Sequence, residues 1–238
     1  MAYTNSPMVE YAKLSPNNSG QRTHAIDRIS PHCVVGQMTA EGLGDLFGKS
    51  STQASANYGI DKNGRVGLYV EEKNRSWCSS SNANDQRAVT IECASDTVEP
   101  YTMNDAVYNT LIKLCTDICR RNGKRKLLWC EDKNISLNYE PAADEMVITV
   151  HRWFASKACP GEWLYSRLGD LAARVTAALA DPVPVQADPV QIQTEPETEK
   201  KKYYRVQLGA FSVKANADSM LQKVKAAGFT DAFIKYGE

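Results

Sequence analysis

Apolar and polar positions alternate in the middle of the chain and predict a strand there. In residues 88–93 (AVTIEC), the apolar side chains of Val89, Ile91 and Cys93 occupy every second position. A period of two places successive side chains on opposite faces of a strand. These three side chains should therefore face a core, and Glu92 should lie on the opposite face.

Other segments predict a hairpin and two short buried strands. Residues 54–60 and 65–70 flank a turn at 61–64 (DKNG), which is a typical hairpin signal. Short apolar runs at 126–129 (KLLW) and 147–150 (VITV) predict two more buried strands.

Apolar residues three or four positions apart predict the helices. Residues 103–122 carry such a stripe, and Thr102 and Asp105 resemble a capping box at its start. A single last helix is expected to begin near Pro160 and to continue to the end of the body. Strands and helices thus alternate along the chain, which predicts an α/β fold with a central mixed β-sheet flanked by helices.

A change in composition at residues 181–202 divides the 238-residue chain. This segment has four prolines, no glycine and no aromatic residue, which is typical of an extended linker. It separates a predicted body, residues 1–180, from a tail, residues 203–238.

The overall charge argues against one class of partner. Lysine plus arginine and aspartate plus glutamate both number 28, so the formal net charge is zero. A protein held to nucleic acid by phosphate contacts is usually basic, and we therefore expect no nucleic-acid partner. No apolar run approaches the roughly 18 residues that would span a membrane, and residues 1–30 contain no apolar signal-peptide core. We expect synthesis in the cytoplasm and no insertion into a membrane.

Histidine and cysteine side chains are the candidates for metal chemistry. His151 follows the predicted strand VITV, Cys159 comes eight residues later, and His32 lies in another strand-like segment, ISPHCVV. Imidazole and thiolate are ligands that zinc prefers, and three protein ligands leave the fourth tetrahedral position open for water. On spacing alone, the alternatives stay open: hydrogen-bonded structural histidines and an inert buried cysteine.

Six segments resemble the zinc-dependent N-acetylmuramoyl-L-alanine amidases of the type-2 family, which share their fold with peptidoglycan-recognition proteins. The segments are SPNNSGQRTHAID, PHCVVGQ, SANYGIDKNG, VEEKNRSWC, AVTIEC and HRWFASKACPG. The resemblance implies a zinc cofactor held by His32, His151 and Cys159. It also implies that peptidoglycan is the substrate, cut at the amide that joins the lactyl group of N-acetylmuramic acid to the L-alanine of the stem peptide.

Two further residues fall at positions of the family pattern. Glu92 occupies the strand position whose carboxylate faces the metal, where it could accept a proton from water and pass it to the leaving amine. Lys157 lies two residues before the ligand cysteine, where a cation can stabilise the tetrahedral oxyanion. The alternatives are an exposed strand glutamate and a solvated surface lysine.

The chain departs from the family pattern at one position. Some members carry a catalytic tyrosine eight residues before the glycine of the hairpin turn, and here that position is Ala56. Tyr58, two residues on, is expected to point to the same face and to form a wall of the substrate site, and the alternative is a catalytic role. Trp77, in the loop after the hairpin, is expected to line the substrate groove together with Cys78.

The tail, residues 203–238, reads as a strand, a helix and a second strand. Its segments VQLGAF, ANAD and KAAGF resemble a SPOR domain, a module that binds glycan strands stripped of stem peptides. A full SPOR module has two such halves, and these 36 residues supply one. A half-module leaves sheet edges unpaired, so we expect it to pair with its copy in a homodimer or to pack on the body. The alternative is a poorly folded remnant.

The leading functional hypothesis is therefore a peptidoglycan hydrolase, an endolysin or autolysin. The alternative is a non-catalytic peptidoglycan-recognition module, but such proteins typically lack the cysteine ligand. A purely structural zinc site is disfavoured because three ligands leave one position open. We expect the enzyme to act on the cell wall after its release or after lysis of the cell.

Overall fold

A seven-stranded mixed sheet forms the centre of the part of the chain that the computed structural model describes, which is residues 3–180, 214–226 and 234. Its strand order is β1-β5-β4-β7-β3-β9-β8. The strands are β1 (Val9–Ala12), β3 (Arg28–Cys33), β4 (Tyr58–Ile60), β5 (Val66–Leu68), β7 (Ala88–Cys93), β8 (Lys126–Leu128) and β9 (Glu145–Ile148). The β4–β5 pair is antiparallel and the other neighbouring pairs are parallel. Two further strands, β2 (Asn18–Gln21) and β6 (Asn74–Ser76), form a separate antiparallel pair.

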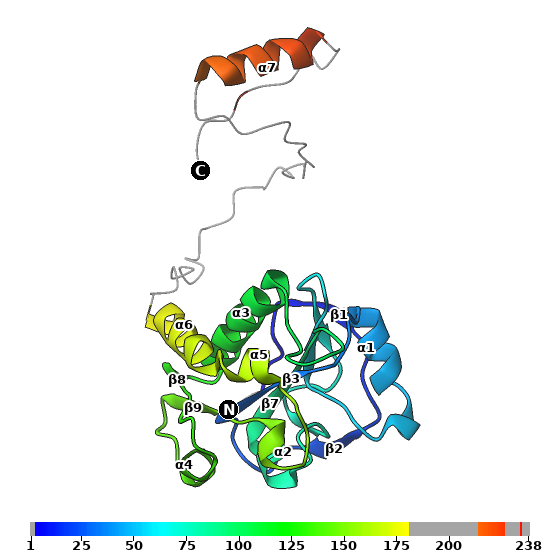
Figure 1. Cartoon of the computed structure of the whole chain (residues 1–238), viewed down its shortest axis with the longest axis vertical. Coiled ribbons are helices and arrows are strands. Elements are labelled where there is room, and N and C mark those ends of the chain that lie inside the picture. Colours follow the sequence, from blue (N-terminus) through cyan, green and yellow to red (C-terminus); the bar gives the residue numbers. More distant parts are fainter. Residues whose placement is uncertain (1–2, 181–213, 227–233, 235–238) are drawn as a thin grey trace, which may run out of the picture. The chain divides into compact units, whose positions relative to one another are not determined.

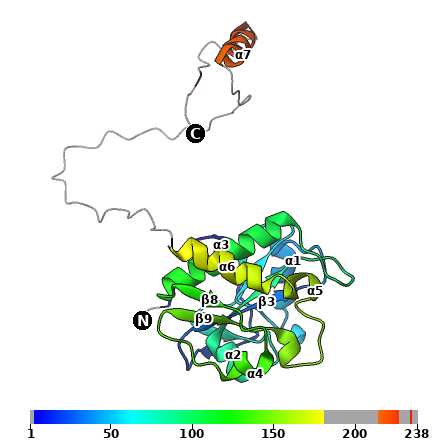
Figure 2. The same ribbon diagram turned by 60° about the vertical axis from the view of Figure 1, so that its left-hand side comes forward.

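Helices cover both faces of this sheet, as Figures 1 and 2 show. They are α1 (Ala40–Phe47), α2 (Asn82–Arg87), α3 (Asp105–Arg121), α4 (Lys133–Asn138), α5 (Glu162–Tyr165) and α6 (Leu168–Ala180), with 3-10 turns η1 (Ser50–Thr52) and η2 (His151–Trp153). Helices α3 and α6 pack against each other over one face, and α1 and α2 contact strands from the other. The predicted α/β class with a mixed sheet is confirmed.

The period-two pattern of β7 has the predicted consequence. Val89, Ile91 and Cys93 belong to the main core beneath α3 and α6, and each is fully buried. Thr90, on the opposite face, hydrogen-bonds instead with the polar groups of Ser76 and Asn57. One face of the central strands is therefore an apolar core, while the other is polar and carries Glu92.

Two predictions about the helices are wrong in detail. The side chain that caps α3 is Asn104, whose carboxamide oxygen accepts from Val107 N at 3.0 Å, and not Thr102. The single helix expected after Pro160 is divided into α5 and α6, because α5 closes with a short i−3 bond from Arg167 N to the carbonyl of Leu164.

Several strands and helices of the structure were not predicted from the sequence. Strands β1, β2 and β6 and helices α2 and α4 are between three and six residues long. So short an element carries too few periods for its apolar pattern to stand out.

The second unit of the chain, residues 186–238, is described through one helix. The helix predicted in the tail is confirmed as α7 (Lys214–Ala226). The predicted linker at 181–202 and both predicted strands of the tail lie outside the described residues. Among the helices that are described, none has the length and apolar character needed to cross a membrane.

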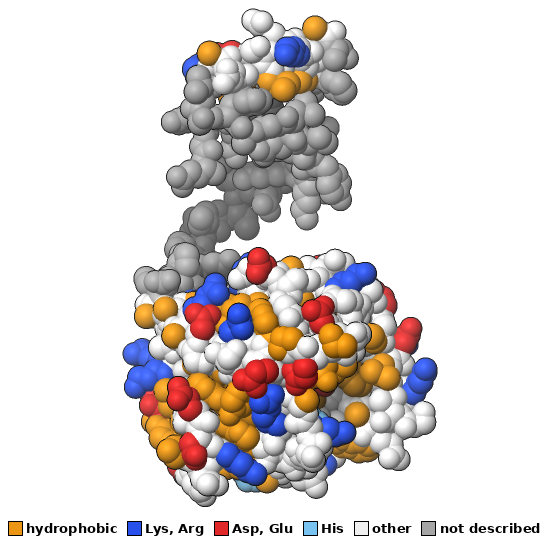
Figure 3. Space-filling model, in the orientation of Figure 1, with side chains coloured by type: hydrophobic (Ala, Val, Ile, Leu, Met, Phe, Trp, Pro, Cys, Tyr) orange, Lys and Arg blue, Asp and Glu red, His pale blue; other side chains and the backbone are white. Residues whose placement is uncertain are grey.

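The surface of the described body carries charges of both signs. Figure 3 shows lysine and arginine interspersed with aspartate and glutamate, and small apolar areas between them, on the face in view. Such a mixture agrees with the formal net charge of zero.

Candidate metal centre

His32 and Glu92 lie side by side on the two central strands. β3 and β7 pair in parallel over six residues, and His32 is directly opposite Glu92 in that register. Neighbours in register point to the same face of a sheet, which here is the polar face. His32 is fully buried, and its Nδ1 lies 3.9 Å from Glu92 Oε1.

His151 and Cys159 reach His32 from the next strand along the sheet. His151 is the first residue of η2, which follows β9 after Thr149 and Val150, and Cys159 follows in the loop before α5. Cys159 Sγ lies 3.2 Å from His32 Nδ1, and the two imidazole rings are 5.1 Å apart between centroids. One ligand atom from each of the three side chains lies within 4.8 Å of the others. The three residues expected to bind metal are thus together at the carboxyl ends of parallel strands, where ligands of such sheets commonly bind.

Burial keeps these histidines in the form that binds a metal. Burial and the neighbouring His151 lower the pKa of His32 to about 3. Burial and the positive charge of Lys157 lower the pKa of His151 as well. Both rings are therefore neutral near pH 7, as a metal ligand must be.

The thiol of Cys159 needs a cation to ionise. Hydrogen bonding to Cys33 and burial raise its pKa well above the ordinary value for cysteine. A divalent cation among the three donors would offset this cost, because coordinating thiols are deprotonated by the metal.

The donor set fits a zinc ion. It combines two imidazoles with one thiol, and the buried His32 Nε2 and Glu92 Oε2 have no hydrogen-bond partner among the described residues. Unpartnered buried polar atoms are costly unless something outside the protein satisfies them. Three protein ligands with an open fourth position are typical of catalytic rather than structural zinc.

Glu92 lies beside this donor set and is not part of it. Its carboxylate groups with His32 and Cys78, but it does not fall within the mutual 4.8 Å spacing of the three candidate ligands. Burial raises the pKa of Glu92 to about 7, although a hydrogen bond from the Cys78 thiol opposes the shift. A carboxyl group with a pKa near neutrality can both accept and return a proton, which suits a general base.

An open pocket of about 440 Å³ leads to the cluster. Lys157 and His151 lie in its wall, and so do Trp77 and Cys78, the two residues expected to line the groove. Lys157 is exposed, so its ammonium group is free to move toward a bound molecule.

Tyr58 does not lie where it was expected. It pairs with Ile91 in the β4–β7 register and points into the main core, whereas Gly59 is the neighbour of Glu92. A Cβ at Gly59 would lie 2.7 Å from Leu43 Cδ1 of α1, so a side chain there would require that buried leucine to move. The prediction that Tyr58 forms a wall of the substrate site is therefore wrong. It failed because Ala56 lies before the strand begins, and its side chain packs in a different cluster, beneath α1.

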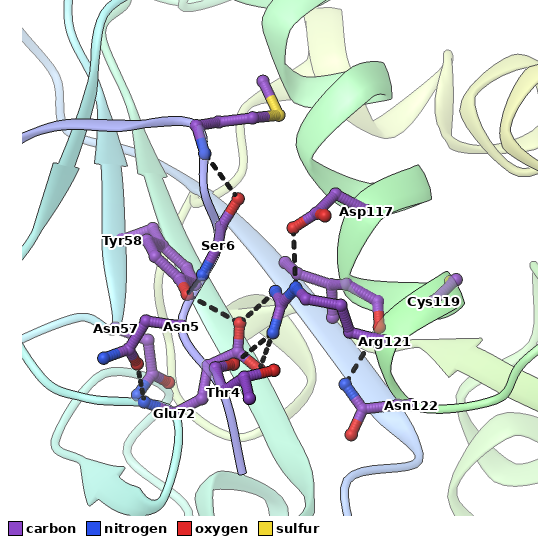
Figure 4. A network of polar contacts seen from close by, with 12 residues as sticks. Thr4, Asn5, Ser6, Asn57, Tyr58, Glu72, Asp117, Cys119, Arg121 and Asn122 are labelled. Atoms are coloured by element: carbon purple, nitrogen blue, oxygen red, sulfur yellow. Dashed lines mark hydrogen bonds and ion pairs between the residues drawn. The ribbon is translucent and has the colours of Figure 1, made fainter. Parts of the chain in front are cut away.

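Tyr58 instead takes part in a buried polar network, shown in Figure 4. Its hydroxyl donates to Glu72 Oε1 at 2.6 Å and accepts from Ser6 N at 2.7 Å. Arg121, at the end of α3, donates to both oxygens of Glu72 and to the carbonyl of Thr4. The network ties the N-terminal segment to β4 and α3, so the role of Tyr58 is structural.

Two residues near the cluster were missed by sequence reasoning. Ser80 Oγ hydrogen-bonds with His151 Nε2 at 2.9 Å, and Ser80 adopts a positive φ of 62° to do so. Asp85, in α2, accepts the backbone N–H groups of Cys78 and Ser79 and so fixes the loop that carries Ser80. No periodic signal in the sequence marks either residue, because both act through a loop whose path is set by tertiary contacts.

Comparison with known proteins gives two family matches. The model of the N-acetylmuramoyl-L-alanine amidase family matches residues 13–162, and that of the SPOR domain matches residues 200–238. No curated protein sequence matches the chain.

Solved structures give weaker likenesses. AmpD, as its selenomethionine derivative, is 19% identical with a TM-score of 0.50, and the match covers 72% of this chain and 99% of that one. The amidase LysC from Clostridium intestinale URNW is 14% identical with a TM-score of 0.48, covering 70% and 94%. PlyL is 14% identical with a TM-score of 0.47, covering 69% and 95%. At such identity, the likeness to AmpD concerns the fold alone.

Proposed function

Because the chain belongs to the N-acetylmuramoyl-L-alanine amidase family, we propose that it hydrolyses peptidoglycan with a zinc ion held by His32, His151 and Cys159. The activity of this family makes the chain a peptidoglycan hydrolase, which cuts the amide between N-acetylmuramic acid and the L-alanine of the stem peptide. The observation that supports the metal site is the convergence of two neutral imidazoles and one thiol within 4.8 Å of one another.

The zinc ion would supply Lewis-acid chemistry, polarising the amide carbonyl and lowering the pKa of a water molecule toward neutrality. The protein residues perform the proton transfers. Glu92 accepts a proton from the attacking water, whose oxygen forms a bond to the carbonyl carbon. Glu92 then gives that proton to the alanine nitrogen as the carbon–nitrogen bond breaks. The products are a muramic acid carboxylate and a stem peptide with a free amino terminus.

Lys157 stabilises the charge that develops on the carbonyl oxygen. It is exposed on the wall of the pocket, which His151 also lines. A flexible ammonium group in that position can approach the oxyanion as it forms, which is where electrostatic stabilisation accelerates a reaction most.

Digestion of purified cell walls tests this proposal. Mass spectrometry should find free stem peptides that begin with unblocked L-alanine, together with glycan strands that keep intact muramic acid. A chelator should abolish the release, and added Zn²⁺ should restore it. Release of disaccharides, or full activity of protein shown by elemental analysis to be metal-free, would contradict the proposal.

The SPOR match implies that the chain also binds peptidoglycan through residues 200–238. The proposed ligand of this segment is glycan stripped of its stem peptides, which is the product of the amidase itself. Cosedimentation with amidase-treated cell walls, compared with untreated walls, tests that preference. A requirement for intact stem peptides would contradict it.

The same segment is proposed to associate with its copy in a second molecule, and the site of action is proposed to be the cell wall. In support, α7 carries an apolar stripe at helical spacing (Ala217, Met220, Leu221 and Val224), yet none of its side chains is fully buried. Light scattering on the full chain and on residues 1–180 tests the association. A dimer that becomes monomeric on truncation is expected, and two monomers would rule it out.

A further inference from the structure

Cys78 is the hydrogen-bonding partner of the Glu92 carboxylate. It follows β6, lies half-buried in the wall of the pocket, and its thiol donates to Glu92 Oε1 at 3.7 Å. The second oxygen, Oε2, is buried and has no partner among the described residues. Among the described residues, the thiol of Cys78 is therefore the one hydrogen-bond donor to the Glu92 carboxylate.

Hydrogen bonds to buried polar groups fix the loop that carries Cys78. The carboxylate of Asp85 accepts Cys78 N at 3.0 Å and the hydroxyl of Ser79 at 2.6 Å. Asp85 is almost fully buried, and the guanidinium of Arg22 donates to its backbone carbonyl. The position of the thiol is thus set by a buried polar network and not by its weak contact with Glu92.

The spacing of the donor atoms argues against Cys78 as a further ligand of the same ion. Cys78 groups with His32 and Glu92, but it does not fall within 4.8 Å of the His151 and Cys159 donor atoms. Zinc bonds to sulfur and nitrogen are about 2.0 to 2.3 Å long, so the ligands of one ion lie within roughly 4.6 Å of each other. An ion held by His32, His151 and Cys159 would therefore leave the thiol of Cys78 to Glu92.

We propose that Cys78 is a positioning residue for the hydrolysis, whose thiol holds the Glu92 carboxylate through Oε1, the oxygen that lies 3.9 Å from His32 Nδ1, in the orientation that accepts the proton of the attacking water. The inference rests on the proposed role of Glu92 as the general base. A carboxylate without this bond could rotate about its side-chain torsions and would spend less time in the reactive orientation. Loss of this hydrogen bond should therefore slow the chemical step and leave substrate binding and metal affinity unchanged.

Three single variants test the inference. Cys78→Ala removes the donor, Cys78→Ser keeps one, and Cys130→Ala is the control, since Cys130 is also a free, half-buried cysteine but lies outside both donor groups. Because a thiol is a weak donor, Cys78→Ala should lower kcat by about tenfold, the worth of one modest hydrogen bond, with KM unchanged. Zinc content and thermal midpoint should equal those of the unmodified protein. Cys78→Ser should recover most of the loss, and Cys130→Ala should show none.

A double variant separates this inference from the proposed function. If Cys78 acts through Glu92, Cys78→Ala should cause no further loss in a Glu92→Gln background. An additive loss, an unchanged kcat in Cys78→Ala, or a fall in zinc content in that variant would each overturn the inference. The last result would assign Cys78 to the metal. Failure of the proposed function would be seen separately, as an unaffected rate in Glu92→Gln alone.

Discussion

Replacing Glu92 by glutamine tests the catalytic assignment most directly. Glutamine has nearly the same shape as glutamate and can accept a hydrogen bond from Cys78, but it cannot take a proton from water. No lysine or arginine pairs with the Glu92 carboxylate among the described residues, and its two polar neighbours are Cys78 at 3.7 Å and His32 at 3.9 Å. The substitution therefore removes the proton acceptor without leaving a buried cation unpaired.

The usual contribution of a positioned acid–base group sets the size of the expected effect. A positioned general acid–base group contributes about 10²- to 10⁴-fold to a rate, or roughly 3 to 5 kcal/mol of the barrier. We expect kcat to fall by that factor in Glu92→Gln. Zinc content should be unchanged, because Glu92 lies outside the three-donor group. Stability should not fall, since burial raises the pKa of this carboxyl to about 7 against the opposing hydrogen bond from Cys78, and a neutral amide avoids the cost of burying a charge.

The assay is the initial rate of stem-peptide release from purified cell walls, read by mass spectrometry, with zinc measured on the same samples. Glu162→Gln serves as the matched control, because Glu162, the first residue of α5, is an exposed glutamate that pairs with Arg152. A Glu92→Gln variant that keeps its metal and turns over within threefold of the unmodified protein would refute the assignment. A variant that loses its metal would show instead that Glu92 is a ligand.

Three further substitutions have distinct expected results. Cys159→Ser should lose most of its zinc and activity, because a neutral hydroxyl is a poor zinc ligand; full zinc content by elemental analysis would show that the site is misassigned. Lys157→Ala should keep its zinc and lose on the order of 100-fold in kcat, as for a lost oxyanion partner; a rate near that of the unmodified protein would remove Lys157 from the mechanism. Tyr58→Phe should lower the free energy of unfolding by about 1 to 3 kcal/mol, because it leaves buried partners of the hydroxyl unsatisfied, while kcat stays the same. Denaturant titration measures the stability and the cell-wall assay measures kcat. A large fall in kcat with unchanged stability would show that Tyr58 belongs to the active site.

The parts of the site that lie on regular strands could be predicted from the sequence. The face of Glu92 followed from the period of two in residues 88–93, and parallel pairing then placed it beside His32. Such a pattern is local, so one sequence is enough to read it. That the donor atoms of His151 and Cys159 lie within 4.8 Å of each other and of a His32 nitrogen was expected through the family resemblance and not through spacing.

The parts that lie in loops could not be predicted in the same way. Counting back from Gly64 placed Tyr58 on the face of Ala56, but Ala56 precedes β4 and the alternation does not extend to it. Ser80 and Asp85 have no periodic context at all. Their roles depend on the path of the loop between β6 and α2, which is fixed by the buried Asp85 carboxylate and by Arg22, 63 positions away in sequence.

This division between strands and loops bears on how the site works. His32 and Glu92 are fixed to each other by paired central strands, so the distance between the candidate base and the candidate ligand varies little. Lys157 lies in a loop that lines the pocket and is exposed, so its position can follow the substrate. Proton transfer needs a short, constant distance, whereas a cation stabilises an oxyanion over a broader range because the attraction falls off slowly with distance. The paired strands therefore hold Glu92, the group that needs a fixed position, and the exposed loop holds Lys157, the group that tolerates movement.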